Sequence, residues 1–381
     1  MIAQRKRVGD SCANCRNGSR VTKAVVMTSV SVAMATFNGA RYIRQQLASL
    51  AAQSHLPLEL VVTDDGSTDG TLNLVDEFAT HAPFPVFVHR NKTRLGHRAN
   101  FLQAAIFCTS DLVAFCDQDD VWDRRKVEVL VPLFNNPDVL LAYHDAIATT
   151  SDGRLIGSLE HWAPPQLINP PMSIGPWAVA HGFTQIFRRS LPFLPDLWAT
   201  SFDFFEMGQR MTHDQWFFFF SSVLGSIAYV NQPLVYYRQH GSNAKGWRAR
   251  ETFTERARSC FTNFSDRYAN AEDCARARAN ILDRAKPKWH AIWYDRASIA
   301  ASKYRHLAQQ YADRRILYTA AEPSRRLIAL MNIFSSGGYD QSHAYNLGPR
   351  SLLKDAVLGV LMGERLKSSR EQATSSGAGV Y

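Results

Sequence analysis

The chain has 381 residues, of which 46% are hydrophobic and 20% are charged, and its formal net charge is +9. This composition excludes a disordered chain and allows a sizeable core, in one large domain with an appendage or in two domains. No window approaches the roughly 20 uncharged apolar residues that a membrane span requires, which predicts a soluble or peripheral protein.

The basic residues gather at the two ends of the chain. Counted along the sequence, residues 1–27 carry six Lys/Arg and one acid, residues 28–247 carry 15 and 20, and residues 248–381 carry 22 and 13. A uniformly basic nucleic-acid binder would not show this split, so no nucleic-acid partner is expected. An acidic body with a basic tail suits a protein that holds cations in its core and contacts an anionic surface. A solvated helical face would explain the tail equally well.

The six cysteines have no framework spacing, which favours a reducing compartment. The pair Cys12-x-x-Cys15 has no second pair or His partner nearby, so a zinc or redox site is not expected there. The segment before Val30 is basic and lacks the apolar core of a signal peptide. Met27 stands just before the first predicted strand, so residues 1–26 are expected to be either a disordered extension or the product of a start codon placed too early.

Short apolar runs alternate with helical periods from Val30 onward, which is typical of a parallel sheet with crossover helices. The predicted strands are 30–35, 58–63, 86–89 and 112–116, and the predicted helices between and after them are 40–53, 71–79, 100–107 and 124–134. Three of the strands end in loops rich in Asp, Asn or Gly: 36–39, 64–70 and 117–120. Ligands of an open α/β sheet bind outside the carboxyl ends of the strands, so these loops are expected to converge on one site.

The alternation weakens after Leu140, where residues 145–177 are expected to pass over the sheet edge as a long excursion. Beyond Trp247 the composition becomes rich in Ala, Arg and Leu, with helices predicted over 270–284 and 296–317. We therefore predict a basic, disordered extension (1–28), a catalytic α/β domain (29–247) and a basic helical region with a disordered tail (248–381).

The acidic run Asp117-Gln118-Asp119-Asp120 is the strongest chemical signal. Alternate positions of an extended loop can direct Asp117 and Asp119 toward one hard cation such as Mg²⁺ or Mn²⁺. Three acids within four residues repel one another, which favours a bound cation. Asp120 is interpreted differently, as the cap of the helix that follows.

Three further segments are weak signals when each is taken alone. Asp64-Asp65-Gly66-Ser67 is an ordinary turn composition that also places carboxylates where a base or ribose could bind. His213-Asp-Gln-Trp216 could be a helix start, and Tyr237-Arg-Gln-His-Gly-Ser-Asn243 could be a loop.

Read in order, these segments resemble the family 2 glycosyltransferases of the GT-A fold, and most closely a rhamnosyltransferase-like bacterial subgroup that builds cell-surface polysaccharides. The resemblance covers about residues 29–246. It rests on the ordered segments Val32–Gly39, Asp64–Thr71, Phe115–Trp122, Gly182–Thr184, His213–Trp216 and Tyr237–Asn243. It implies a mostly parallel central sheet flanked by helices, with a C-terminal helical extension.

The resemblance also implies a role for each site residue. Asp214 would be the catalytic base of an inverting transfer from a nucleotide diphosphate sugar to a saccharide or lipid-linked acceptor. The sugar nucleotide would contact Thr36, Asn38, Asp65, Arg98 and Asp117. Asp117, Asp119 and His240 would hold Mg²⁺ or Mn²⁺, and Gly182, Thr184 and Trp216 would lie on the acceptor side.

The chain departs from the subgroup at three points. Arg98 in Gly96-His-Arg-Ala-Asn100 stands one place earlier than the usual arginine, which leaves its reach to the phosphates open. His181-Gly182-Phe183 replaces small polar residues, and Gln215 stands where an aromatic is frequent.

Other interpretations remain open at this point. One is a sugar-nucleotide-binding protein with the same fold and another reaction, such as a nucleotidyltransferase; another is a basic adaptor at a membrane surface. For the enzyme we predict a cytoplasmic location, with peripheral contact to the inner face of the membrane through Arg314-Arg315, Arg325-Arg326 and the stretch 352–366. Homo-oligomerisation through the same helices is the equal alternative. The donor sugar, acceptor and linkage are not encoded in the motifs.

Overall fold

The computed structural model describes residues 28–159, 166–241, 243, 264–341 and 344–361. The predicted extension up to residue 27, the Cys12-x-x-Cys15 pair, the low-complexity tail and residues 362–366 of the amphipathic stretch lie outside the described residues. Every structural statement below concerns the described part of the chain.

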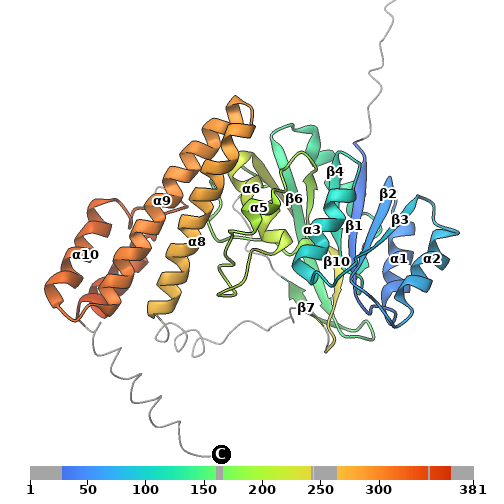
Figure 1. Ribbon diagram of the computed structural model, residues 1–381, viewed down its shortest axis with the longest axis horizontal. Coiled ribbons are helices and arrows are strands. Elements are labelled where there is room, and N and C mark those ends of the chain that lie inside the picture. The colour runs from blue at the N-terminus through green and yellow to red at the C-terminus, as the bar shows by residue number, and fades with distance from the viewer. Residues whose placement is uncertain (1–27, 160–165, 242, 244–263, 342–343, 362–381) are drawn as a thin grey trace, which may run out of the picture.

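A mixed ten-stranded sheet occupies the centre of the molecule (Figure 1). Its strands are β1 (Val30–Thr36), β2 (Glu59–Asp64), β3 (Val86–Arg90), β4 (Leu112–Cys116), β5 (Val121–Trp122), β6 (Val139–Thr149), β7 (Leu155–Leu159), β8 (Ile168–Asn169), β9 (Ile186–Arg188) and β10 (Ser226–Arg238). The main path runs β3-β2-β1-β4-β9-β6-β10-β5, with β7 beside β6 and β8 beside β10. The pairings β1–β2, β1–β4, β2–β3 and β6–β10 are parallel, and the others are antiparallel.

Helices cover both faces of this sheet, and further helices stand beside it at one end of the molecule. They are α1 (Ile43–Ala51), α2 (Thr71–Ala79), α3 (His97–Phe107), α4 (Lys126–Leu130), α5 (Pro195–Trp198), α6 (His213–Leu224), α8 (Phe264–Ala285), α9 (Ala291–Thr319), α10 (Pro323–Ser335) and α11 (Pro349–Lys354), with the 3-10 turns η1 (Val131–Asn135), η2 (Gly182–Thr184) and η3 (Lys286–Lys288) and the π-helical η4 (Asp355–Leu361). The predicted α/β class, with a sheet flanked by helices and helices at the C-terminal end, is confirmed.

Alternation along the strands divides the interior into two cores. Successive side chains of a strand point to opposite faces. In β1, Val32 and Met34 therefore pack on one face with α1, whereas Ala33 packs on the other with α3 and α6. This arrangement holds the carboxyl ends of β1, β2 and β4 side by side, which places the loops after them at one edge.

Two expectations about the middle of the chain are wrong in detail. The segment 145–177 does not leave the sheet at once, because β6 continues to Thr149 and turns back as β7. The predicted helix over 124–134 is a short α4 followed by a 3-10 turn, because Pro132 lacks the N–H that a continuing α-helix needs.

The helices after residue 264 share one core with the α/β domain. The rings of Phe219 in α6 and Tyr304 in α9 lie 5.7 Å apart, as do those of Phe220 and Trp289. Arg296 of α9 also donates to the carboxylate of Asp138 (2.6 Å), just ahead of β6. Figure 1 shows α8 and α9 standing beside the sheet, with α10 at the far end of the molecule.

Candidate functional site

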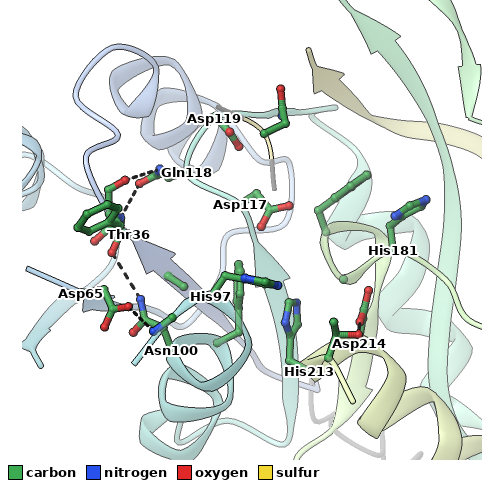
Figure 2. Close-up of a pocket in the computed structure, with 18 of the residues that line it drawn as sticks. Thr36, Asp65, His97, Asn100, Asp117, Gln118, Asp119, His181, His213 and Asp214 are labelled. Carbon is green, nitrogen blue, oxygen red and sulfur yellow. Dashed lines mark hydrogen bonds between the residues drawn. The ribbon is translucent and has the colours of Figure 1, made fainter. Parts of the chain in front are cut away.

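A cavity of about 380 Å³ opens at the carboxyl edge of the parallel strands. We call it the central cavity. It is lined by Ala35, Thr36, Phe37, Asp65, Arg94, Gly96, His97, Asn100, Phe101, Asp117, Gln118, Asp119, His181, Gly182, Phe183, Thr212, His213, Asp214, Tyr237 and Asn243. Loops that are distant in the sequence therefore converge as the strand order predicts. In Figure 2, Thr36 and Asp65 lie on one side, His181 and Asp214 lie on the other, and Asp117 lies between them.

The acidic run enters this cavity from the end of β4. Gln118 is clamped to the loop after β1, because its Oε1 accepts from Phe37 N (3.0 Å) and its Nε2 donates to Phe37 O (3.1 Å). Gly39 leaves room for this amide, since a Cβ there would stand 2.2 Å from Gln118 Oε1. With Gln118 pinned toward β1, its neighbours Asp117 and Asp119 are both left lining the cavity.

The carboxylates of the run have distinct surroundings. Burial, followed by the neighbouring charges of Asp119 and Asp214, raises the pKa of Asp117 above its usual range. Asp119 Oδ2 lies 2.8 Å from His240 Nε2, and the His240 ring stacks on Tyr42 at 4.6 Å. The structure thus joins Asp119 to a predicted partner 121 residues away in sequence.

The interpretation of Asp120 as a helix cap is wrong. Asp120 is fully buried, its Oδ1 accepts from Arg238 N at the end of β10 (3.1 Å), and α4 begins only at Lys126. The two-residue strand β5 separates Asp120 from the helix. Asp120 therefore fastens the acidic loop to β10 instead of starting a helix.

The loop after β2 joins the cavity through Asp65. Its Oδ1 accepts from Asn91 Nδ2 (2.9 Å) and Leu95 N (2.7 Å), and its Oδ2 accepts from Gly96 N (2.7 Å). Asp65 thus fixes the loop before α3 while lining the cavity. Thr36 lines it too, and its hydroxyl donates to Asp64 (2.8 Å).

Two of the predicted nucleotide contacts are placed elsewhere. Asn38 has a φ of 49°, and its side-chain oxygen accepts from Thr68 N (2.9 Å), so it closes the turn instead of lining the central cavity. Arg98 donates to Asp203 (2.7 Å) and Glu206 (2.5 Å), outside the cavity lining. The prediction that Arg98 contacts the phosphates is therefore not supported by its position.

The opposite wall of the cavity is made by the start of α6 and the turn η2. Asp214 stands in the first turn of α6, where its Oδ1 accepts from Thr212 Oγ1 and from Gln215 N (2.8 Å). Gly182 packs on the same helix start, since a Cβ there would lie 2.5 Å from His213 Nε2. A glycine at position 182 is therefore required by the close approach of these two elements.

Two predicted acceptor-side residues do not reach the cavity. Thr184 is fully buried and donates to His181 O (2.7 Å). Trp216 is also fully buried, and its indole N–H donates to Pro192 O (3.0 Å). Both belong to the framework behind the cavity, because α6 turns Trp216 away from Asp214.

Three basic side chains in or behind the cavity were not predicted from the sequence. His97, at the first position of α3, lines the cavity. Arg94 also lines it, with the guanidinium 3.8 Å from the Phe37 ring centroid, and it is the only Lys or Arg among the described lining residues. Lys126 is fully buried behind the acidic run, and its Nζ donates to Phe183 O (2.6 Å). Burial lowers the pKa of Lys126 to about 7, against the opposing effect of nearby Asp120 and Asp117.

The residues at the centre of the cavity fit a hard divalent cation only if a bound substrate and water supply further donor atoms. No group of three or more His, Cys, Asp or Glu side chains in the described part of the chain is arranged as a metal cluster. Mg²⁺ is commonly held by one or two carboxylates together with substrate phosphates and water. Asp117 and Asp119 offer that donor set beside open space, and the raised pKa of Asp117 reflects the cost of leaving these charges uncompensated.

Part of the chain is similar in sequence to known proteins. Residues 31–192 match glycosyl transferase family 2. The matched residues are similar to this family, and they include Asp65, Asp117 and Asp119 of the central cavity. An uncharacterized glycosyltransferase of Nostoc sp. is 27% identical over 242 residues, which are 60% of this chain and 70% of that protein. The dTDP-rhamnosyl transferase RfbG of Shigella flexneri is 32% identical over 109 residues, covering 27% of this chain and 38% of that protein.

A solved structure of S. aureus TarS (residues 1–349) in complex with UDP-GlcNAc aligns with a TM-score of 0.45 and 16% identity, over 91% of this chain and 92% of that one. The helices of the described ranges include none that is long and apolar enough to cross a membrane.

Proposed function

We propose that this protein is a metal-dependent, inverting family 2 glycosyltransferase that moves rhamnose or another hexose from a nucleotide diphosphate donor to a saccharide or lipid-linked acceptor in surface polysaccharide synthesis. The observation that carries the proposal is the division of one cavity between Asp117 and Asp119 in the middle and Asp214 on one wall (Figure 2). A base and a leaving-group site that face each other across the cavity are what an in-line displacement requires.

Each wall would have its own task. The nucleoside would lie against Thr36 and Asp65, with its diphosphate toward Asp117 and Asp119. Asp214 would accept the proton of the acceptor hydroxyl while that oxygen bonds to the anomeric carbon. The bond from this carbon to the diphosphate oxygen breaks with its electron pair leaving on the diphosphate, so the configuration inverts. A cation bound at Asp117 and Asp119 would neutralise charge on the departing group.

The direct test uses the full chain with a panel of nucleotide sugars and with Mg²⁺ or Mn²⁺. We expect slow hydrolysis of one donor that stops on chelation, and an inverted anomeric configuration when transfer is followed by NMR. Retention of configuration, or full activity in the presence of chelator, would contradict the proposed mechanism.

Arg94 would replace Arg98 as the cation that contacts the diphosphate. It faces a cavity whose other charged lining residues are the acids Asp65, Asp117, Asp119 and Asp214. Among the described residues it forms no ion pair, so its guanidinium is available to phosphate oxygens.

We predict that Arg94→Ala weakens binding of the nucleoside diphosphate by about tenfold, the usual effect of losing one charge-assisted hydrogen bond. Calorimetric titration with UDP, dTDP and GDP in the presence of Mn²⁺ measures this. Lys92→Ala is the matched control, because Lys92 is exposed on the same loop but does not line the central cavity. An equal loss in both variants would mean that only the overall charge of the loop matters.

Gly182→Ala should impair catalysis through a steric effect. The added methyl group would stand 2.5 Å from His213 Nε2 and 3.6 Å from Asp214 Cβ, so the imidazole of His213, which adjoins Asp214 at the start of α6, must shift. A misplacement of about 1 Å at a reacting group can lower the rate by about a hundredfold. We expect such a fall in kcat with little change in donor binding.

The control for this change is Gly175→Ala, since a Cβ at Gly175 meets nothing within 4 Å. Thermal unfolding of both variants checks that the fold is kept. If Gly182→Ala retained the native kcat, then the contact between η2 and α6 would not position the base.

A further inference from the structure

The carboxylate of Asp203, in the loop between α5 and α6, is fully buried. Its Oδ2 accepts from Arg98 Nη1 (2.7 Å), and its Oδ1 accepts from Gln215 Nε2 (2.9 Å). The same Oδ1 also accepts from the backbone N–H groups of Phe205 (2.8 Å) and Glu206 (3.1 Å). Buried polar networks whose members are all hydrogen-bonded fix one arrangement of the elements that they join. We call Arg98, Asp203 and Gln215 the buried brace.

The buried brace joins two helix starts that line the central cavity. Helix α3 begins at His97, which lines the cavity, and Arg98 follows it by one position. Helix α6 carries Asp214, which also lines the cavity, and Gln215 follows it by one position. One helical step of about 100° turns each following side chain away from its lining neighbour. Arg98 and Gln215 therefore meet on Asp203 outside the cavity lining.

Each end of the buried brace is fixed to a residue that has a task in the proposed reaction. On the α3 side, Asp65 accepts from the backbone N–H directly before the helix (2.7 Å). On the α6 side, Arg98 Nη1 also donates to Arg210 O (2.5 Å). The brace therefore holds the chain on both sides of Asp214, at Arg210 before it and at Gln215 after it. It connects the proposed nucleoside contact to the proposed base.

A pair of rings makes a second contact between the same two helices. The ring centroids of Phe101 in α3 and His213 in α6 lie 4.1 Å apart. Stacked rings tolerate an offset, whereas hydrogen bonds weaken steeply when they are bent. We therefore expect the buried brace, and not this ring contact, to set the position of α6 along α3.

We propose that the buried brace positions the carboxylate of Asp214 relative to the bound donor, so that Arg98, Asp203 and Gln215 are positioning residues of the transfer reaction. The inference rests on the proposed function, because it assigns the task of the brace through that of Asp214. A buried ion pair is weak evidence for stability, since the desolvation of its charges offsets much of their attraction. Its fixed geometry is instead what proton transfer over hydrogen-bond distance requires.

The test is Gln215→Met, which keeps the length of the side chain and removes its hydrogen bond to Asp203. We expect kcat for donor hydrolysis to fall by about tenfold or more, because a small misplacement of a reacting group lowers the rate. Calorimetry with UDP, dTDP and GDP in the presence of Mn²⁺ should show unchanged affinity. Arg98→Lys should act in the same direction, because an ammonium group keeps the charge but not the planar fork that bonds Asp203, Glu206 and Arg210 O.

Asn169→Leu is the matched control for the loss of a buried amide. Asn169 and Gln215 are 2% and 3% exposed, and Asn169 Nδ2 donates to Gln166 O (2.8 Å) in a segment that does not line the central cavity. Thermal unfolding should be affected similarly in Gln215→Met and Asn169→Leu, whereas only Gln215→Met should lose kcat. Hydrogen exchange over residues 203–217, followed by mass spectrometry, should be faster than native in the two brace variants and native in the control.

Native kcat in both brace variants would overturn the proposal. A loss of donor affinity as large as the loss of kcat would also overturn it, because that result means a general disturbance of the cavity. A native chain that hydrolyses no nucleotide sugar would count against the proposed function, and hydrogen exchange would then decide on the brace alone. Native exchange over residues 203–217 in both variants would show that the brace does not hold the start of α6, and faster exchange there would support it.

Discussion

Replacing Asp214 by Asn should lower the rate of sugar transfer by about a thousandfold, within the range that general-base catalysis contributes. The substitution keeps the shape of the side chain and its contact with Gln215 N, so α6 should still begin at the same residue. The amide cannot accept the proton of the acceptor hydroxyl. Steady-state kinetics with the donor found in the panel should show a fall in kcat with an unchanged KM for the nucleotide sugar.

Asp196→Asn is the control for this variant. Asp196 also stands in the first turn of a helix, α5, but it does not line the central cavity, so its loss tests the general effect of removing an acid from a helix start. If Asp214→Asn kept more than a tenth of the native rate, the base would have to be sought among the neighbouring imidazoles of His181 and His213.

Asp119→Asn should weaken the binding of a divalent cation in the presence of a nucleotide. The change removes a negative charge from the donor set and weakens the contact with His240 Nε2, which lies 2.8 Å away. Even changes to residues that only support a ligand commonly cost 10- to 100-fold in metal affinity, so we expect a loss of about a hundredfold for Mn²⁺ in the presence of UDP or dTDP. Calorimetry or the electron paramagnetic resonance signal of free Mn²⁺ would measure it.

His240→Ala should also lower the affinity for Mn²⁺, but by less than Asp119→Asn does. His240 would either hold Asp119 in place or bind the cation beside it. Asp123→Asn serves as the control, since Asp123 lies four residues further on and is paired with Arg125 outside the cavity. Native Mn²⁺ affinity in Asp119→Asn would exclude this carboxylate as a ligand.

The strands and the convergence of their loops could be predicted from the sequence because local patterns determine them. The buried runs of β1, β2 and β4 are short, apolar and bounded by Gly, Asp or Asn, and parallel strands must present such loops at one edge. Asp65 and Asp117 could be placed at the site for the same reason, whereas Asp214 was placed there only through the family resemblance. Their roles in binding and catalysis remain predictions until the variants are measured.

Errors occurred where a distant partner decides what a side chain does. Arg98 is held by Asp203, 105 residues later, and Asp120 by the backbone of Arg238, 118 residues later. No local spacing indicates either contact. Trp216 was assigned to the acceptor side because it adjoins Asp214, but one helical step of about 100° separates neighbours, and two steps turn Trp216 into the core.

Two of the three missed residues, Arg94 and Lys126, have an ordinary sequence context. Arg94 lies in a polar loop where a cation is common, and only its position over Phe37 at the cavity rim distinguishes it. Lys126 resembles a surface residue at a helix start, yet it is fully buried between the acidic run and the turn η2. A buried lysine close to carboxylates cannot be inferred without the fold that brings them together.

The packing of α8 and α9 on α6 has a consequence for any shortened or recombined form of the enzyme. A chain that stops at residue 247 would leave Phe219 and Phe220 without Tyr304 and Trp289, and exposing each ring would cost about 2–3 kcal/mol. The helix that carries Asp214 would thereby lose its outer support. Grafting these C-terminal helices onto a related transferase would succeed only if the matching side of α6 moved with them, so the unit of exchange is larger than the sequence boundary near residue 248 indicates.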